Sequence, residues 1–190
     1  MINKLKTAPA VEPVTLAEAR AFHGISANDD NSRDQVIMSR IKSARIACEE
    51  ITSRKFITQT WLAYSDSFID KMNLFGDLQS VTSVKYYDVN AALQTLDTSI
   101  YYVDTINNSV SLAPNKAWPD TLINPNSVII EYVCGYGLAS SVPEPIKEAI
   151  KIIVSQWEGY QSSIEGARLS TLPYAATQLL GFYTDYREYF

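Results

Sequence analysis

The stretch VIIEYVCGYGLASSVPEPIKEAI, residues 128–150, joins three kinds of local structure and decides how the chain is organised. Its first part, VIIEYVC, is rich in β-branched and aromatic residues and is typical of a strand. Gly135 and Gly137 then provide a turn, and the segment from Glu144 onward has the spacing of an amphipathic helix. A strand, a Gly-x-Gly turn and a helix are also the opening elements of many phosphate-binding loops.

The glycine turn lacks the other features of a phosphate-binding loop. Such a loop places its glycines at the helix N-terminus, where backbone N–H groups and the helix dipole converge on the anion. Here residues 138–143 separate the glycines from the helix, and Pro143 and Pro145 remove two N–H donors. We therefore interpret Gly135-Tyr136-Gly137 as a bend between a strand and a helix.

Short strand-like segments fill the middle of the chain. Asp, Asn, Gly and Pro, which favour turns, separate them. Because these segments do not alternate with helices, they predict an antiparallel β-sheet or small sandwich and argue against a parallel nucleotide-binding sheet. The segments are ITQTWLAYS (57–65), SVTSVKYYD (80–88), SIYYVDTI (99–106), SVSLAP (109–114) and SVIIEYVCGY (127–136).

Helical patterns lie on both sides of this β region. Thr15 and Glu18 have the spacing of a capping box, which opens a short helix. The next helix is longer, and its apolar residues recur at spacings of four and three, as on a buried face. Two isoleucines lie off the apolar stripes of the helices, and each is either an isolated exposed side chain or part of a contact with another subunit. They are Ile46, with Arg45 and Glu49 beside it, and Ile152.

The C-terminal segment also has helical spacing and is unusually aromatic. Because apolar termini are rarely left in water, we expect this segment either to pack on the protein's own core or to dock into a partner. Its candidate docking residues are Tyr183, Tyr186, Tyr189 and Phe190.

The charge and composition narrow the classes of function. The chain has 190 residues, a net charge of −5 and a pI near 4.9, so it lacks the basic surface of a nucleic-acid-binding protein. It shows no apolar run long enough for a membrane helix and no signal-peptide core, so we expect it to be made in a reducing cytoplasm. Cys48 and Cys134 are accordingly expected to be buried, reduced thiols.

The sequence offers no residue set for catalysis. His23 is the only histidine, and it follows a predicted helix, where a structural role is expected. No Cys or His cluster has zinc-ligand spacing, and the acidic stretch DDNSRD is too short and lacks the glycine of an EF-hand calcium loop. We therefore expect a protein that is not an enzyme and that has no catalytic residues, no metal and no cofactor.

Five fragments, taken in their order along the chain, resemble the head–tail connector family of tailed bacteriophages. This family, also called adaptor or head-completion proteins, consists of structural proteins without cofactors. The resemblance implies a small helical bundle with a β insertion that forms a ring, usually of twelve copies, beneath the portal. The fragments are EPVTLAEARAF (12–22), RIKSARIACEEITSRKFITQTW (40–61), LQSVTSVKYYD (78–88), YVCGYG (132–137) and VPEPIKEAIKIIV (142–154).

The resemblance implies an α+β protein organised around this insertion. We expect bundle helices in residues 1–56, a β insertion in 57–140, a bundle helix in 141–162, and a linker with an aromatic C-terminal helix in 163–190, forming one folded unit overall.

The implied partners are the portal ring above, a stopper or tail-completion protein below, and copies of the chain itself. DNA would pass through the channel without specific binding, because an acidic wall repels it. The expected location is the virion neck. The alternatives are another neck protein, such as a stopper or tail-completion protein, and a soluble ligand-binding module.

Overall fold

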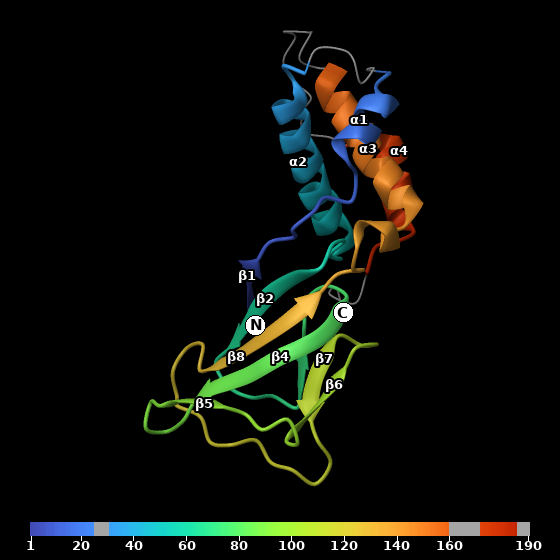
Figure 1. The fold of residues 1–190 in the computed structure, drawn as a ribbon. Helices are drawn as coiled ribbons and strands as arrows, with labels where there is room; N and C mark the ends of the chain where they lie inside the picture. Colours follow the sequence, from blue (N-terminus) through green and yellow to red (C-terminus); the bar gives the residue numbers. More distant parts are fainter. Residues whose placement is uncertain (25–30, 160–171, 186–190) are drawn as a thin grey trace. The chain divides into compact units, whose positions relative to one another are not determined.

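A computed structural model describes residues 1–24, 31–159 and 172–185 of the chain (Figure 1). Contacts within the chain divide it into two compact units. The β unit comprises Met1–Pro9 and Thr58–Tyr136, and the helical unit comprises Ala10–Ile57 and Gly137–Phe190. The predicted α+β class, with an antiparallel β region inserted into a helical bundle, is confirmed. That the two units form one folded body overall stays a prediction.

The β unit contains two antiparallel sheets. The larger sheet has the order β1-β2-β8-β4-β5, and the smaller sheet has the order β3-β7-β6. The strands of the larger sheet are β1 (Ile2–Thr7), β2 (Gln59–Ser65), β8 (Val128–Cys134), β4 (Leu78–Tyr87) and β5 (Leu93–Thr95). Those of the smaller sheet are β3 (Lys71–Asn73), β7 (Ser109–Leu112) and β6 (Tyr101–Asp104).

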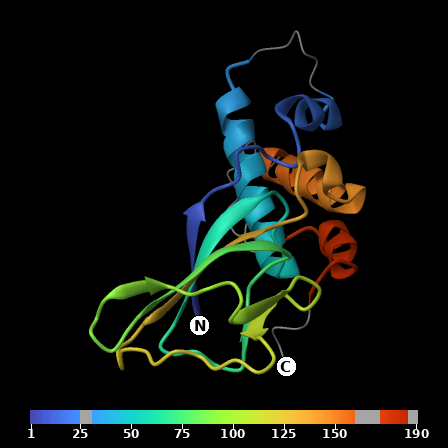
Figure 2. The same cartoon turned by 60° about the horizontal axis from the view of Figure 1, so that its bottom comes forward.

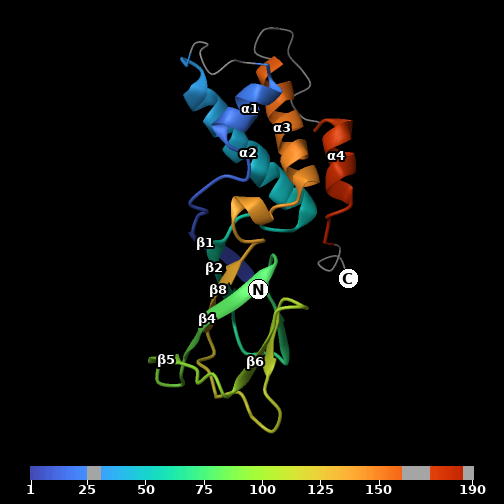
Figure 3. The same cartoon turned by 45° about the vertical axis from the view of Figure 1, so that its right-hand side comes forward.

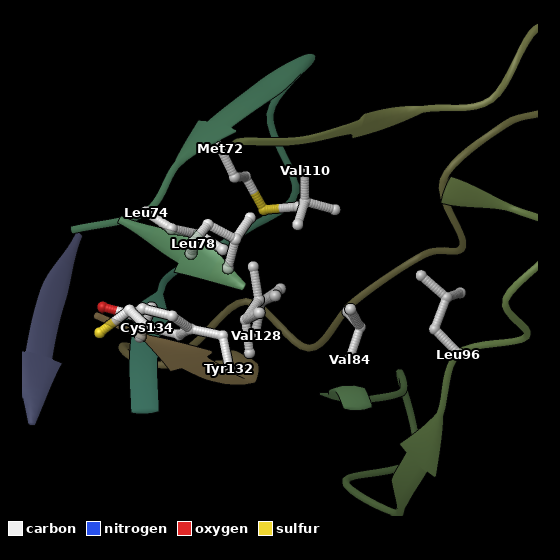
Figure 4. Close-up of a cluster of buried hydrophobic side chains, with 11 residues drawn as sticks. Met72, Leu74, Leu78, Val84, Leu96, Val110, Val128, Tyr132 and Cys134 are labelled. Atoms are coloured by element: carbon white, nitrogen blue, oxygen red, sulfur yellow. The ribbon is translucent and has the colours of Figure 1, made fainter. Parts of the chain in front are cut away.

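Apolar side chains from both sheets form the core of the β unit (Figure 4). Met72 of β3 and Val110 of β7 lie in the same buried cluster as Val84 of β4 and Tyr132 of β8. Along β8, every second residue is buried, which is the pattern of a strand with one face on a core. The two sheets therefore form a small sandwich.

Two turns in the β unit are built by aspartates. Asp88 accepts hydrogen bonds from the backbone N–H groups of Asn90 (2.9 Å) and Ala92 (3.0 Å) between β4 and β5. Asp104 does the same for Ile106 (3.0 Å) and Asn107 (2.9 Å) between β6 and β7. These carboxylates mimic a backbone turn and so build the two hairpin connections.

The described residues of the helical unit form four α-helices. In Figure 3, α3 (Glu144–Gly159) lies between α2 (Asp34–Thr52) and α4 (Tyr174–Gly181). The predicted capping box opens α1 (Leu16–Phe22): Thr15 N–H donates to Glu18 Oε2 (2.7 Å), and Glu18 N–H donates to Thr15 Oγ1 (3.2 Å). The apolar stripe of α3 is buried as its spacing predicts, with Ile146, Ile150 and Ile153 all excluded from solvent.

The glycine bend has the predicted structural role. Gly135 and Gly137 have φ angles of 118° and 120°, which glycine adopts without a steric penalty. The backbone N–H of Gly135 donates to Asp77 O (2.8 Å), and Gly135 O accepts from Gln79 Nε2 (2.7 Å). A short 3-10 turn at Ala139–Ser141 precedes α3, which begins at Glu144. The glycine backbone thus terminates the sheet.

The structure also contains elements that the sequence analysis missed. The three strands β1, β3 and β5 were not predicted, and β1 lies in a region expected to be helical. The C-terminal helix is shorter than its spacing suggests, because α4 ends at Gly181. In the described part of the chain, no helix is long and apolar enough to cross a membrane.

Candidate assembly surfaces

The residues of α2 that were predicted to contact another subunit are only partly exposed. Ile46 is 44% exposed, as expected, and Ile152 on α3 is half-buried. Arg45 and Glu49 are buried, so their expected exposure is wrong. The reason is that charged side chains can enter a core when they neutralise each other, which a pattern of apolar residues does not reveal.

Both of these side chains belong to a buried ionic cluster. Arg45 Nε lies 2.6 Å from Glu12 Oε2, and Arg45 Nη1 lies 2.9 Å from Glu49 Oε2. Burial alone would lower the pKa of Arg45, but the carboxylates of Glu49 and Glu12 outweigh it, so the pKa is raised. The guanidinium therefore stays charged and fixes the segment before α1 to the middle of α2.

The same cluster continues to the C-terminal end of α2. Glu49 Oε1 accepts a hydrogen bond from the backbone N–H of Phe56 (3.1 Å). Lys55 Nζ, which is also buried, lies 3.1 Å from Glu50 Oε1 and 3.8 Å from Glu49 Oε2. Glu49 thereby holds the turn after α2, where Ser53 adopts a left-handed conformation.

A second ionic contact joins α2 to α3. Glu158 pairs with Arg40 and, at 2.5 Å, with Arg33 Nη2. Glu158 is buried, whereas its position in the sequence pattern indicates the solvated face of α3. Arg33 and Arg40 thus serve the packing of the bundle.

The C-terminal segment is attached to the helical unit as far as Asp185. Arg54 Nε donates to Tyr183 O (2.7 Å), and Asp185 N–H donates to Thr52 O (2.8 Å). Tyr183 itself is half-buried, and Ala176 and Leu180 of α4 are fully buried. Up to this point the segment packs on the protein's own bundle. Tyr186, Tyr189 and Phe190 lie outside the described residues, so their docking role stays a prediction.

The β unit exposes surfaces that the sequence analysis did not single out. β1 is exposed along its whole length, and it forms one edge of the larger sheet (Figure 2). β5 forms the other edge and is equally exposed. Ile2 and Leu93 on these strands are 67% and 50% exposed. Short strands at the edges of a sheet, such as the three residues of β5, carry only a weak sequence signal.

The described residues offer little that could support catalysis. Among them, no group of three or more His, Cys, Asp or Glu side chains could hold a metal ion. His23 caps the end of α1, and burial raises the pKa of the Cys48 thiol to about 12, with the charge of Glu49 adding to the effect. Cys48 and Cys134 are both buried and form no disulfide, as predicted.

One surface cavity of about 380 Å³ lies in the β unit, beside Asp66, Leu122 and Ile123. Its lining is mostly apolar. Its one carboxylate, Asp66, accepts a hydrogen bond from the backbone N–H of Asn126 (2.9 Å) and so has a structural task. The cavity does not present a convergent set of polar groups for a small ligand.

Comparison with known proteins identifies the fold. No protein-family model matches the chain, and no curated protein matches it in sequence. The chain does share its fold with chains of a gene transfer agent particle. A chain of the neck of the empty particle, computed with C6 symmetry, matches with a TM-score of 0.77 and 16% identity, covering 97% of this chain and 95% of the other.

Two further matches agree with the first. A chain of the native gene transfer agent virion matches with a TM-score of 0.77 and 18% identity, and a chain of the native neck computed with C12 symmetry matches with 0.72 and 16%. The same shares of the two chains, 97% and 95%, are covered in both. The expected resemblance to head–tail connector proteins is therefore confirmed at the level of the fold.

Proposed function

We propose that the chain is a structural head–tail connector, or adaptor, of a tailed phage or prophage. In this role it forms a ring under the portal, extends the DNA channel and provides the surface on which the tail assembles. One observation carries the proposal: 97% of the chain follows the fold of a chain from a neck that was computed with C12 symmetry.

The charge and the surfaces of the chain are compatible with a ring around DNA. Its net charge is −5, and a channel wall of the same sign as the phosphate backbone lets the duplex pass without adhering. A closed ring of identical subunits needs two different contact faces on each copy. Ile46 and Ile152 of the helical unit are our candidates for these faces, and the buried Arg45 and Glu49 support Ile46 from within.

The proposed partners follow from the position of the ring. Its upper face would meet the portal, and the aromatic C-terminus with Tyr186, Tyr189 and Phe190 is the proposed docking element. Tyrosine and phenylalanine provide large contact areas at low entropic cost. Its lower face would meet a stopper or tail-completion protein. The protein would act without a cofactor or catalysis, in a virion neck assembled in the bacterial cytoplasm.

Addition of the purified chain to heads made without the neck proteins tests this proposal. DNA-filled heads that contain the portal but lack all neck proteins should bind the chain directly, and tails should then attach once the remaining neck proteins are added. If the chain binds these heads only after another neck protein has bound, it is a stopper or tail-completion protein. If tails attach equally well without it, the proposed function is wrong.

A further inference from the structure

We propose that, in the ring, β1 of one copy pairs with β5 of the next copy, so that the larger sheets of neighbouring subunits become continuous. This inference rests on the proposed ring and adds the identity of one contact between its subunits. The observation behind it is that both edges of the larger sheet are open within the described chain and differ in chemistry, as a head-to-tail contact requires.

The direction of the two strands is set by the topology of the sheet. Every neighbouring pair from β1 through β2, β8 and β4 to β5 is antiparallel. Four reversals leave β1 and β5 running in the same direction. In a ring with many subunits, each copy is related to the next by a small rotation, which nearly preserves strand direction. The contact between β1 and the neighbour's β5 is therefore a parallel pair.

The backbone of β5 has groups available for such a pair. Leu96 N–H donates to Val84 O (2.8 Å), so Leu96 directs its backbone groups toward β4. In an antiparallel ladder, successive residues alternate in the direction of their backbone groups. The N–H and C=O of Thr95, which lies next to Leu96 and opposite Lys85, consequently point to the open edge.

The register of the sheet also shows which side chains share a face. Asn3 lies in the row of the buried residues Ala63, Ile130 and Val84, so it is on the face that packs against the smaller sheet. Side chains alternate along a strand, so Ile2 and Lys4 are on the outer face. On β5, Leu93 and Thr95 are on the outer face by the same rule.

Lys6 also belongs to the outer face, because it pairs with Glu131 of β8 (2.6 Å), which lies opposite Leu62 in the ladder. Lys4, the residue opposite Leu62 on β1, is exposed as well. The β1 edge is therefore basic.

One parallel register matches the chemistry of both edges. If Ile2 lies beside Leu93 of the next copy, two exposed apolar side chains cover each other on the outer face. Asn3 then lies beside the amide of Gln94, and Lys6 lies at the level of Asp97. The complete alignment places Ile2, Asn3, Lys4, Leu5 and Lys6 beside Leu93, Gln94, Thr95, Leu96 and Asp97 of the next copy.

The charges of the two edges are complementary. β5 is flanked by Asp88 and Asp97, and hydrogen bonds lower the pKa of both carboxyl groups, from Gln94 in the first case and from Ser99 in the second. Both aspartates are thus ionised at neutral pH. In the proposed register Asp97 lies at the level of Lys6, and Asp88 adds negative charge at the turn before β5. Two copies meeting through two β1 edges or two β5 edges would instead bring like charges together. The charges therefore favour the head-to-tail contact over a symmetric dimer.

Engineered cysteines test the register in the full-length chain bound to its portal. The double variant Ile2→Cys/Leu93→Cys places two thiols on the same face of neighbouring copies, and oxidation should give a ladder of covalent oligomers on a denaturing gel. The native Cys48 and Cys134 are buried and do not compete. The matched control, Asn3→Cys/Leu93→Cys, puts the thiols on opposite faces and should give no ladder. Both replaced positions of the test variant are exposed, so folding should be unaffected.

A charge exchange provides the second measurement. Lys6→Glu and Asp97→Lys should each weaken ring assembly on the portal roughly tenfold, and the double variant should recover most of that loss. The double variant does not restore the contact of Lys6 with Glu131 within one copy. Recovery of assembly would therefore show that the weakened contact lies between subunits.

The outcomes distinguish the pairing of β1 with β5 from the connector function. A ring that forms on the portal without a ladder, or without recovery in the charge exchange, contradicts strand pairing and leaves the connector function intact. A chain that forms no ring on the portal contradicts both.

Discussion

Arg45 of α2 and Glu12 of the segment before α1 form an ion pair of 2.6 Å, although 33 positions separate them in the sequence. The pair connects the entrance of the helical unit to the centre of its longest helix. Glu49 lies on the other side of the same guanidinium, at 2.9 Å, and holds the turn that leads out of the helix. One arginine thus fixes both ends of the segment that precedes the β insertion.

Replacement of Arg45 by Ala should lower the free energy of unfolding by about 3 kcal/mol or more, because it leaves the buried Glu49 carboxylate without its main partner. Chemical denaturation measures this change. Glu144→Gln is the matched control: it removes an ion pair with Lys147 whose carboxylate is largely exposed, and it should cost no more than about 0.5 kcal/mol. Equal, small effects in the two variants would contradict a structural role for the cluster.

The capping box at α1 predicts a pH-dependent contribution to stability. Hydrogen bonds from Thr15 lower the pKa of Glu18 below its ordinary value of 4.5, so the ionised form stabilises the folded state. This contribution is complete above pH 4.5 and disappears as the pH falls through the lowered pKa. Glu18→Ala should therefore cost about 0.5 kcal/mol at pH 7 and progressively less as the solution is acidified. A difference that stays constant with pH would rule out the ionised carboxylate as its source.

Two truncations separate the docking and packing roles of the C-terminus. Removal of residues 186–190 keeps the hydrogen bonds of Tyr183 and Asp185, so the protein should remain folded but no longer join portal-containing heads. Removal of residues 183–190 also deletes those two bonds and should lower the melting temperature. Circular dichroism and sedimentation with heads measure the two effects. Normal head binding by the shorter truncation would show that docking occurs elsewhere.

Ile46 provides a test of the proposed helical contact between subunits. Ile46→Glu should leave the melting temperature of the free chain nearly unchanged, because the side chain is 44% exposed, but it should reduce ring assembly on the portal at least roughly tenfold. Ile106→Glu is the control, since Ile106 is 83% exposed in a turn for which no contact is proposed. Equal assembly by both variants would remove Ile46 from the interface.

The elements with strong periodic patterns were predictable from the sequence. The capping box of Thr15 and Glu18, the start of α3 at Glu144 and the alternation along β8 all follow from local rules that the structure obeys. The fold class followed from the order of these elements, because strands without intervening helices indicate an antiparallel sheet.

Features that depend on distant contacts were not predictable. Short strands such as β3 and β5, with three residues each, are strands only because a neighbouring strand pairs with them. The sequence pattern placed Arg45 and Glu158 on the surface, because it does not reveal partners that are far away in the sequence. The open edge of β1 could be recognised only after the order of the sheet was known.

Native mass spectrometry of the purified chain mixed with its portal ring tests the central claim most directly. A connector should add a defined number of copies to each portal, about twelve by analogy with the C12 neck, and the complex should persist as a single assembly. A chain that stays monomeric and leaves the mass of the portal unchanged would contradict the connector function and the pairing of β1 with β5.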